Sequence, residues 1–324
     1  MKVSIIGTGI YGLALALNIS KNAKEVWMWT ESDKVYDEWK KTKNLKSIID
    51  VKLSSKIHVS KSYQTVLDNT TLIVIASSSK FVDIICKDMK EFYDKSIPIC
   101  VATKGIEDST EDLLTNIVKK ILKTKNVSVI SGPTFAVDIA HNEAVALALG
   151  SENKKTAKTV MKCLSTDRLK LRPTDDMLGI QICGTVKNII AIASGILAGL
   201  GYTDSTRAFL VNESMHDIKN IIYYLGGNPK TILSFAGIGD LMLTCTSIKS
   251  RNYSFGKVIG STKNPKEIKK FLCDHTVEGY FALNTVYKLL HKKNINIPLI
   301  DLIYDIVYNE KDPESLIQFL IEKE

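Results

Sequence analysis

The sequence predicts an α/β protein in which an N-terminal, Rossmann-like doubly wound sheet is followed by an all-helical C-terminal domain. In the first half, short apolar runs alternate with segments of helical periodicity, a Gly-x-Gly-x-x-Gly motif follows the first run, and strand-like runs stop near residue 173. Such alternation is typical of βαβ units and a mainly parallel sheet. A chain of 324 residues also exceeds the usual size of a single core. We therefore expect two domains, residues 1–172 and 173–324.

The strands and helices of the first domain follow from its apolar pattern. Strands are expected at Val3–Ile6, Glu25–Trp29, Leu72–Ala76, Ile97–Ala102, Val127–Ser131, Ala144–Leu149 and Arg168–Arg172. The helices between them include Tyr11–Asn22, Phe81–Tyr93 and Glu111–Lys123. The last strand should end at Pro173, and Thr174, Asp175 and Asp176 should cap the next helix.

The second domain is predicted to contain helices only. They are expected at about 176–200, 205–225, 237–246, 252–260, 265–272, 278–293, 298–309 and 313–323. The clearest breaks are Gly226-Gly227-Asn228-Pro229 and Asn264-Pro265.

The charge pattern argues against a nucleic-acid partner. The net charge is +8, but the lysines occur singly or in pairs, without a run of five basic residues or interleaved aromatic residues. We expect most of them to be solvated, with a weak attraction for anionic substrates.

The cysteines and the apolar segments indicate a cytoplasmic protein. The six cysteines contain no Cys-x-x-Cys pair and no histidine neighbours, which favours buried free thiols over disulfides or a metal site. The chain opens on a strand rather than a signal peptide, and the apolar stretch Ile189–Leu200 is too short and glycine-rich to span a bilayer.

The glycine motif predicts a dinucleotide site. Gly7 permits a tight turn, Gly9 lets the backbone approach a pyrophosphate, and Gly12 lets the helix pack closely on the strand. The amides that begin the helix would supply positive charge to the phosphates. Glu31, after the second strand, is placed to accept hydrogen bonds from the adenosine ribose and to repel a 2′-phosphate; Lys34 is the nearest cation in sequence. We therefore expect NAD to be preferred over NADP.

Polar residues at the carboxyl ends of strands predict a substrate site. These segments are Ser77-Ser78-Ser79, Thr103-Lys104-Gly105 and the turn Ser131-Gly132-Pro133-Thr134, whose small residues and backbone donors suit an anion. Lys104 follows its strand directly, so its ammonium should lie at the sheet edge.

The helical half adds a lysine in apolar surroundings. Lys187 lies just before the apolar stretch, where burial should lower its pKa toward the range of a general base. Asp240, between glycines, suits orienting a lysine or a hydroxyl, and Arg251-Asn252 suits a phosphate dianion. None of the five histidines has an acidic partner recognisable in sequence.

Three segments together resemble NAD(P)-dependent glycerol-3-phosphate dehydrogenase of the bacterial type. They are Ser131–Ala136, Val186–Gly201, and Gly239–Ser247 with Ser250-Arg251-Asn252. The resemblance implies reversible reduction of dihydroxyacetone phosphate to sn-glycerol 3-phosphate by NAD(P)H for glycerophospholipid synthesis. It also implies a homodimer.

The resemblance also implies roles for single residues. Lys187 is the proton acceptor in the oxidative direction, and Lys104 contacts both substrate and cofactor. The substrate site is lined by Gly132, Thr134, Asn188, Asp240, Ser250, Arg251 and Asn252. The dinucleotide contacts are Ile10, Tyr11, Ala136, Glu278 and Arg251.

The chain departs from the family pattern in the loop Thr42–Ile48, at Ser77 and at Thr30-Glu31. The alternatives are another two-domain dehydrogenase, acting on a hydroxy acid or a hydroxyacyl-CoA, and a nucleotide-sensing protein without catalysis. The first needs a His-Glu or His-Asp pair, and the second needs the loss of Lys187 or Asp240.

Overall fold

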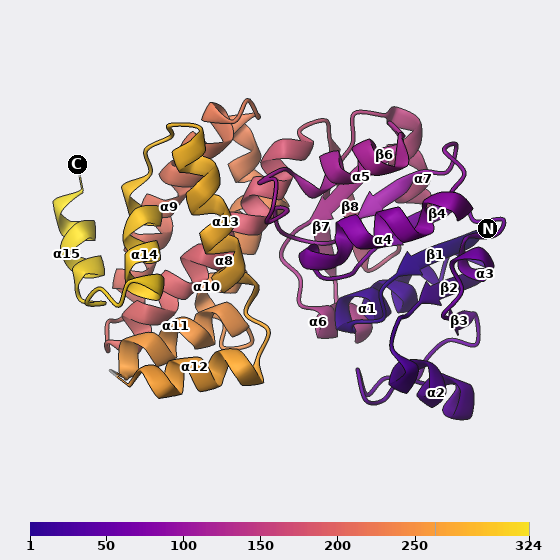
Figure 1. The fold of residues 1–324 in the computed structure, drawn as a ribbon, viewed down its shortest axis with the longest axis horizontal. Helices are drawn as coiled ribbons and strands as arrows, with labels where there is room; N and C mark the ends of the chain where they lie inside the picture. The colour runs from indigo at the N-terminus through magenta and orange to yellow at the C-terminus, as the bar shows by residue number, and fades with distance from the viewer. Residues whose placement is uncertain (263, 324) are drawn as a thin grey trace. The chain divides into compact units, whose positions relative to one another are not determined.

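A computed structural model describes residues 1–262 and 264–323 and divides the chain into two compact units, drawn in Figure 1. The first unit comprises Met1–Lys104 and Asp112–Met177, and the second comprises Gly105–Glu111 and the chain from Leu178 onward. The short segment 105–111 is part of the second, helical unit because two of its acidic side chains interact with residues of that unit. Asp108 accepts a hydrogen bond from Thr285, and Glu111 pairs with Lys292.

The first unit is built on an eight-stranded sheet with the order β3-β2-β1-β4-β5-β6-β7-β8. The strands are β1 (Lys2–Ile6), β2 (Glu25–Trp29), β3 (Ile57–Ser60), β4 (Leu72–Ile75), β5 (Ile99–Val101), β6 (Val127–Ser131), β7 (Val145–Gly150) and β8 (Leu169–Thr174). Neighbouring strands run parallel except for β6 and β7. The chain order reverses between β1 and β4, and ligands of doubly wound sheets bind outside the carboxyl ends of the strands at such a point.

Helices cover the sheet on both sides, as the sequence predicts (Figure 1). In one set, α1 (Ile10–Ile19) packs against both α6 (Ala136–Ala140) and α7 (Lys154–Leu164). In the other set, α4 (Val82–Met89) packs against α5 (Leu114–Leu122). The short helices α2 (Asp33–Thr42) and α3 (Tyr63–Leu67) flank β3. Val3 and Ile5 of β1 and Leu13 of α1 are fully buried in one core, so burial of apolar surface fixes α1 against the strand that precedes it.

Two strands differ from the prediction. Strand β3 was not predicted, because a four-residue run containing His58 carries little hydrophobic signal. Strand β8 continues through Pro173 to Thr174 instead of ending before the proline, and Pro173 lies opposite Leu149. Proline has no N–H for a second neighbour and is tolerated on an edge strand, and β8 is last in the sheet order.

The second unit is helical. Its elements are α8 (Met177–Gly199), α9 (Asp204–Tyr224), η3 (Pro229–Leu233), η4 (Phe235–Gly239), α10 (Asp240–Thr246), α11 (Arg251–Ser261), α12 (Pro265–Asp274), α13 (Glu278–Lys292), α14 (Pro298–Tyr308) and α15 (Ser315–Glu322). The segment predicted as one helix over 237–246 is instead two elements, because the backbone at Gly237 leaves helical geometry (φ −86°, ψ −111°).

Helix α8 is longer than the apolar stretch noted in the sequence. Its 23 residues are enough, by length and composition, to cross a membrane, but 89% of its most apolar window is buried inside the protein. Such burial is typical of a helix in the core of a protein.

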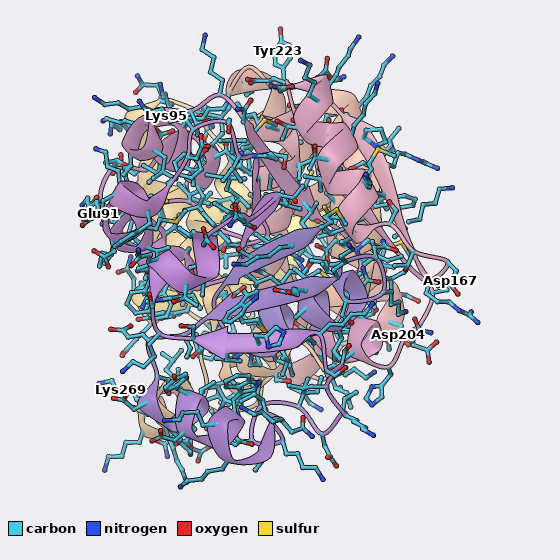
Figure 2. The ribbon with its side chains drawn as sticks, turned by 90° about the vertical axis from the view of Figure 1, so that its right-hand side faces the viewer. Glu91, Lys95, Asp167, Asp204, Tyr223 and Lys269 are labelled. Carbon is cyan, nitrogen blue, oxygen red and sulfur yellow. The ribbon has the colours of Figure 1, made fainter. Side chains whose placement is uncertain are left out.

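Most charged side chains are solvated, and most thiols are not. Figure 2 shows Glu91 and Lys95 of the first unit, and Lys269 of α12 in the second, extending outward from the ribbon. Five of the six cysteines are buried free thiols, whereas Cys273, expected to be buried like the others, is exposed on α12.

Candidate active site

The glycine motif forms a loop between β1 and α1 with three distinct environments. Gly7 has a φ of +116°, and a Cβ there would lie 2.7 Å from the Ala76 carbonyl oxygen at the end of β4. A Cβ on Gly12 would lie 2.5 Å from the Gly7 carbonyl oxygen. By contrast, a Cβ on Gly9 would have no atom within 4 Å. Gly7 and Gly12 are therefore required by the fold, whereas Gly9 keeps space open in front of the N-terminus of α1.

This space fits the pyrophosphate of a dinucleotide. Gly9 caps α1 without a side-chain hydrogen bond, so the first helical amides present the positive end of the helix dipole there. Ile10, which begins the helix, is 40% exposed, and Tyr11 is half-buried.

A buried hydroxyl pair ties the loop to the end of β2. The Thr8 hydroxyl donates to Thr30 Oγ1 at 2.8 Å, and Thr30 Oγ1 also accepts from the Ser32 amide at 3.3 Å. Glu31 lies between Thr30 and Ser32, and its side chain is exposed.

A second lysine, Lys61, interacts electrostatically with Glu31. Lys61, which follows β3, forms an ion pair with Asp33. The hydrogen bond to Asp33 raises the pKa of Lys61, and the negative charge of Glu31 adds to this. The sequence pointed only to Lys34, because Lys61 is brought to this edge by the strand that was not predicted.

Lys104 lies at the carboxyl end of β5, as expected, and is partly buried. Its neighbour Thr103 is buried and donates a hydrogen bond to the Ser77 carbonyl oxygen at 2.9 Å, which ties the loops after β4 and β5 together. Gly105, with a φ of +132°, then turns the chain into the segment that packs with the helical unit.

The turn after β6 holds two buried hydroxyls. Ser131 Oγ and Thr134 Oγ1 are buried and have no hydrogen-bond partner among the described residues. The Thr134 amide donates to the Gly132 carbonyl oxygen at 2.8 Å, so this backbone donor, expected to serve an anion, is already used. A Cβ on Gly132 would lie 2.8 Å from the Ala146 carbonyl oxygen, so β7 requires glycine there. Ala136 begins α6 directly after this turn.

Lys187 of α8 is buried and paired, with 6% of its surface exposed. Its Nζ donates to Asp240 Oδ1 at 2.7 Å and to Thr244 Oγ1 at 2.7 Å, and Asp240 is fully buried. The Thr244 hydroxyl donates in turn to the Asp240 carbonyl oxygen at 2.6 Å. The carboxylate favours the charged ammonium, whereas burial, the effect expected from the apolar sequence around Lys187, opposes it.

Asp240 reaches the lysine because of the break before α10. A Cβ on Gly237 would lie 2.0 Å from the Ile232 carbonyl oxygen, so only glycine permits this backbone contact. The Ser234 hydroxyl accepts from the Gly237 amide at 3.3 Å and stabilises the turn. Asp240 then starts α10, and Thr244, one turn later, lies on the same face.

The thiol of Cys245, next to the pair of Lys187 and Asp240, is unreactive. Burial raises the pKa of Cys245 to about 12, so it remains a neutral thiol near pH 7. Its carbonyl oxygen accepts from the Ser194 hydroxyl at 2.7 Å, a further link between α10 and α8.

Four glycines bring α11 into backbone contact with α8. A Cβ on Gly195 would lie 2.0 Å from the Tyr253 carbonyl oxygen, and one on Gly256 would lie 1.9 Å from the Ile192 carbonyl oxygen. Gly199 and Gly260 are equally constrained, at 2.3 Å and 2.2 Å from the facing backbone oxygens. This close approach fixes the N-terminus of α11 beside the segment of α8 that carries Lys187.

The start of α11 supplies residues with different exposure. Ser250 caps the helix by accepting from the Tyr253 amide at 3.3 Å, so its hydroxyl has a structural use. Arg251 is exposed. Asn252 is 7% exposed; its Nδ2 donates to Asn188 Oδ1 at 2.9 Å, and its Oδ1 accepts from the Gly279 amide at 2.8 Å.

The second unit thus brings Lys187, Asn188, Asp240 and Asn252 together, and the first unit holds the glycine loop, Glu31, Lys104, Gly132, Thr134 and Ala136. Glu278, expected to contact the cofactor, is exposed in the first turn of α13.

Sequence reasoning missed two members of the helical cluster, Thr244 and Gly279. The four-residue spacing from Asp240 was the available signal for Thr244, whereas Gly279 acts through a backbone contact that has no sequence signature.

A histidine–carboxylate pair does exist, contrary to the sequence interpretation. His291 Nε2 lies 3.0 Å from Asp301 Oδ1, and the two side chains are 54% and 38% exposed. The pair joins the end of α13 to the start of α14, so it lacks the burial expected of the catalytic pair that another dehydrogenase would need.

Comparison with known proteins decides the family. The model of the NAD-dependent glycerol-3-phosphate dehydrogenase N-terminus matches residues 2–157, and that of the C-terminus matches residues 176–318. The chain belongs to the NAD-dependent glycerol-3-phosphate dehydrogenase family. Within this family it is similar to the glycerol-3-phosphate dehydrogenase (NAD(P)+) of Clostridium botulinum strain Eklund 17B, with 35% identity over 100% of this chain and 98% of the relative. The corresponding protein of Lactobacillus acidophilus is 34% identical over 98% of this chain and 96% of the relative.

Solved structures lead to the same family. The crystal structure of glycerol-3-phosphate dehydrogenase from Coxiella burnetii superposes with a TM-score of 0.92 at 30% sequence identity, and it covers 99% of both chains. The fold class and the family resemblance predicted from sequence are therefore confirmed.

Proposed function

We propose that this chain is an NAD(P)-dependent glycerol-3-phosphate dehydrogenase that interconverts dihydroxyacetone phosphate and sn-glycerol 3-phosphate. The observation that carries the proposal is the buried pair of Lys187 and Asp240 in a chain of this family. A lysine that is 6% exposed and held by both a carboxylate and a hydroxyl is positioned to move one proton at a fixed point.

The residues of the helical unit have separate roles in proton transfer and in phosphate binding. In reduction the Lys187 ammonium donates a proton to the carbonyl oxygen of the substrate, and in oxidation the neutral amine accepts the proton of the hydroxyl. Asp240 and Thr244 fix the position of Nζ, and Asp240 stabilises the ammonium form. Arg251, exposed at the start of α11, binds the phosphate dianion, which matches a planar guanidinium.

The nicotinamide cofactor supplies or accepts the hydride when bound. The loop at Gly7, Gly9 and Gly12 would hold its pyrophosphate, and Lys104, just after β5, would contact both the cofactor and the substrate. NAD is preferred over NADP because Glu31 repels a 2′-phosphate and accepts hydrogen bonds from ribose hydroxyls. Lys61 weakens this preference, since its charge offsets part of the acidic field.

An assay of NADH oxidation tests the function. The purified protein should oxidise NADH with dihydroxyacetone phosphate and respond only weakly to unphosphorylated dihydroxyacetone, because the groups placed for the phosphate are then left unpaired. Equal rates with the two substrates would refute the assignment. The homodimer and the cytoplasmic location stay predictions, and light scattering of the purified protein tests the first.

A further inference from the structure

We propose that the exposed face of α7 is an electrostatic docking surface for an anionic lipid membrane. This α7 lysine face consists of Lys154, Lys155, Lys158 and Lys162, and all four side chains are exposed. The helix contains no acidic residue. Docking through this face would hold the protein at a membrane by charge alone, without inserting any segment into it.

The arrangement of these lysines costs the helix stability. Three of them follow one another at intervals of four residues, and like charges at this spacing repel. Lys154 and Lys155 also lie in the first turn, where the helix dipole disfavours positive charge and no acidic residue offsets it. By contrast, Lys87 of α4 pairs at 3.2 Å with Asp83, one turn before it. The requirements of folding therefore do not account for the α7 lysine face.

The charge of the face is not neutralised by ion pairs within the described part of the chain. The acidic residues nearest in sequence already have other partners. Glu152, before the helix, pairs with Lys119 at 2.9 Å, and Asp167, after the helix, lies 4.0 Å from Arg168. The four ammonium groups are therefore available to an external anion.

The surface beside the end of α7 is also basic. Asn22, just after α1, donates to the Ser165 carbonyl oxygen, just after α7, at 2.6 Å, so the two helices end side by side. Lys21 and Lys24, which flank this contact in sequence, are exposed. The first unit accounts for the whole net charge of +8, because the acidic and basic side chains of the second nearly balance.

The composition of the face favours lipid over other polyanions. The exposed residues of α7 are lysines alone. Protein interfaces are depleted in lysine and enriched in aromatic residues and arginine, and directed contacts to phosphates favour arginine. Lysine is a flexible point charge that suits mobile headgroups, and clusters of about four to eight cations on a helix are typical of binding to anionic lipid.

The apolar side of α7 is not available to a bilayer. Val160 and Leu164 are fully buried in the core of the first unit. An amphipathic helix that enters a membrane must turn such residues toward the acyl chains. We therefore infer adhesion to the headgroups, which salt should reverse.

Membrane docking fits the product of the proposed reaction. sn-Glycerol 3-phosphate becomes a glycerophospholipid only when long acyl chains esterify its hydroxyls, and the acylated product resides in a bilayer. An acyl transfer at a membrane surface must therefore consume it, and docking would release it close to that reaction. This benefit rests on the proposed function, whereas the binding itself does not.

Co-sedimentation of the full chain with lipid vesicles tests the proposal. The protein should bind vesicles of equimolar phosphatidylcholine and phosphatidylglycerol at low salt, and not vesicles of phosphatidylcholine alone. The triple variant Lys154→Glu/Lys158→Glu/Lys162→Glu should lower the partition coefficient by about 10²-fold, at roughly fivefold for each cation lost near an anionic surface. Its melting temperature should be kept or raised, and its kcat should be unchanged.

The matched control reverses three exposed lysines of α12, as Lys266→Glu/Lys269→Glu/Lys270→Glu. It changes the net charge equally and should keep most of the affinity for the vesicles. Equal losses in the two triple variants would show that net charge alone drives binding, and would overturn the proposal. Absence of binding to the anionic vesicles, or tighter binding of α7 to double-stranded DNA, would also overturn it. Failure to reduce dihydroxyacetone phosphate, with vesicle binding intact, would instead refute the proposed function.

Discussion

The glycine loop of the first unit and the lysine cluster of the second illustrate two ways of building a binding site. The loop uses backbone amides and empty space, and its six residues, Gly7–Gly12, are contiguous. The cluster uses side chains from α8, α10 and α11 with a backbone amide of α13, and hydrogen bonds join these buried groups to one another.

This difference predicts how each region responds to substitution. In a site made of backbone groups, a larger side chain can be introduced wherever the fold has room. Such a substitution lowers the affinity for the ligand but not the stability of the fold. A buried side-chain cluster couples chemistry to stability, because removing one partner leaves another buried and unpaired.

The largest expected effect is at Lys187. Substitution Lys187→Ala should lower kcat by at least ~10²-fold, the scale of losing a general acid–base group, while NADH binding is retained. It should also destabilise the fold by about 3–5 kcal/mol, because Asp240 is left charged and buried. Steady-state kinetics and thermal unfolding measure the two effects.

The double variant Lys187→Ala/Asp240→Asn is the matched control for that change. It should recover part of the lost stability, since no uncompensated charge remains, but none of the activity. If Lys187→Ala alone kept most of its turnover, the proton would be moved by another group.

Two glycines of the loop test the contrast within the first unit. Gly9→Ala should leave the melting temperature unchanged but raise the Kd for NADH about tenfold or more, at 1.4 kcal/mol per decade, because its methyl occupies the pyrophosphate space. Gly12→Ala should lower the melting temperature, since its Cβ would lie 2.5 Å from a backbone oxygen. Equal melting temperatures for the two variants would contradict the assignment of separate roles.

Arg251 tests whether an exposed residue of the helical unit behaves like the buried ones. Arg251→Ala should raise the KM for dihydroxyacetone phosphate about 10- to 100-fold, on the scale of a charge-assisted hydrogen bond, with a smaller change in kcat and none in stability. Lys257→Ala, which removes an exposed cation on the same helix, should leave KM unchanged. A similar rise in KM for both variants would indicate general attraction rather than a phosphate contact.

The smallest effect concerns cofactor choice. We expect kcat/KM for NADH to exceed that for NADPH about tenfold, since a carboxylate near a 2′-phosphate costs on the order of 1–3 kcal/mol. Glu31→Arg should narrow or invert this ratio, whereas Asp37→Asn, which removes a charge farther along α2, should barely move it. A clear NADPH preference in the unmodified protein would show that Lys61 or Lys34 governs the pocket.

The sequence predicted the fold class because the βαβ alternation and the glycine motif are local signals. It failed at β3, whose four residues gain their stability from pairing with β2, and at Pro173, which only the edge position of β8 permits. Lys187 and Asp240 were identified separately, but their 2.7 Å contact joins residues 53 positions apart, and neither periodicity nor spacing encodes it.

The networks at Thr244, Gly279 and Lys61 were beyond prediction for a related reason. Each depends on one segment packing against another: α10 on α8, α13 on α11, and the loop after β3 on α2. A residue type and a spacing can indicate which group is chemically capable. They do not indicate which neighbour satisfies its hydrogen bonds.

The glycine contact between α8 and α11 also has a mechanical consequence. Because the two backbones touch at four glycines, with no side chain between them to change rotamer, the helices should move as one stiff piece. Lys187 is carried by the first helix and Arg251 by the second. The proposed proton donor and the proposed phosphate anchor should therefore keep their spacing during thermal motion. A substrate bound to Arg251 would then stay aligned with Lys187 without a closing motion inside the helical unit.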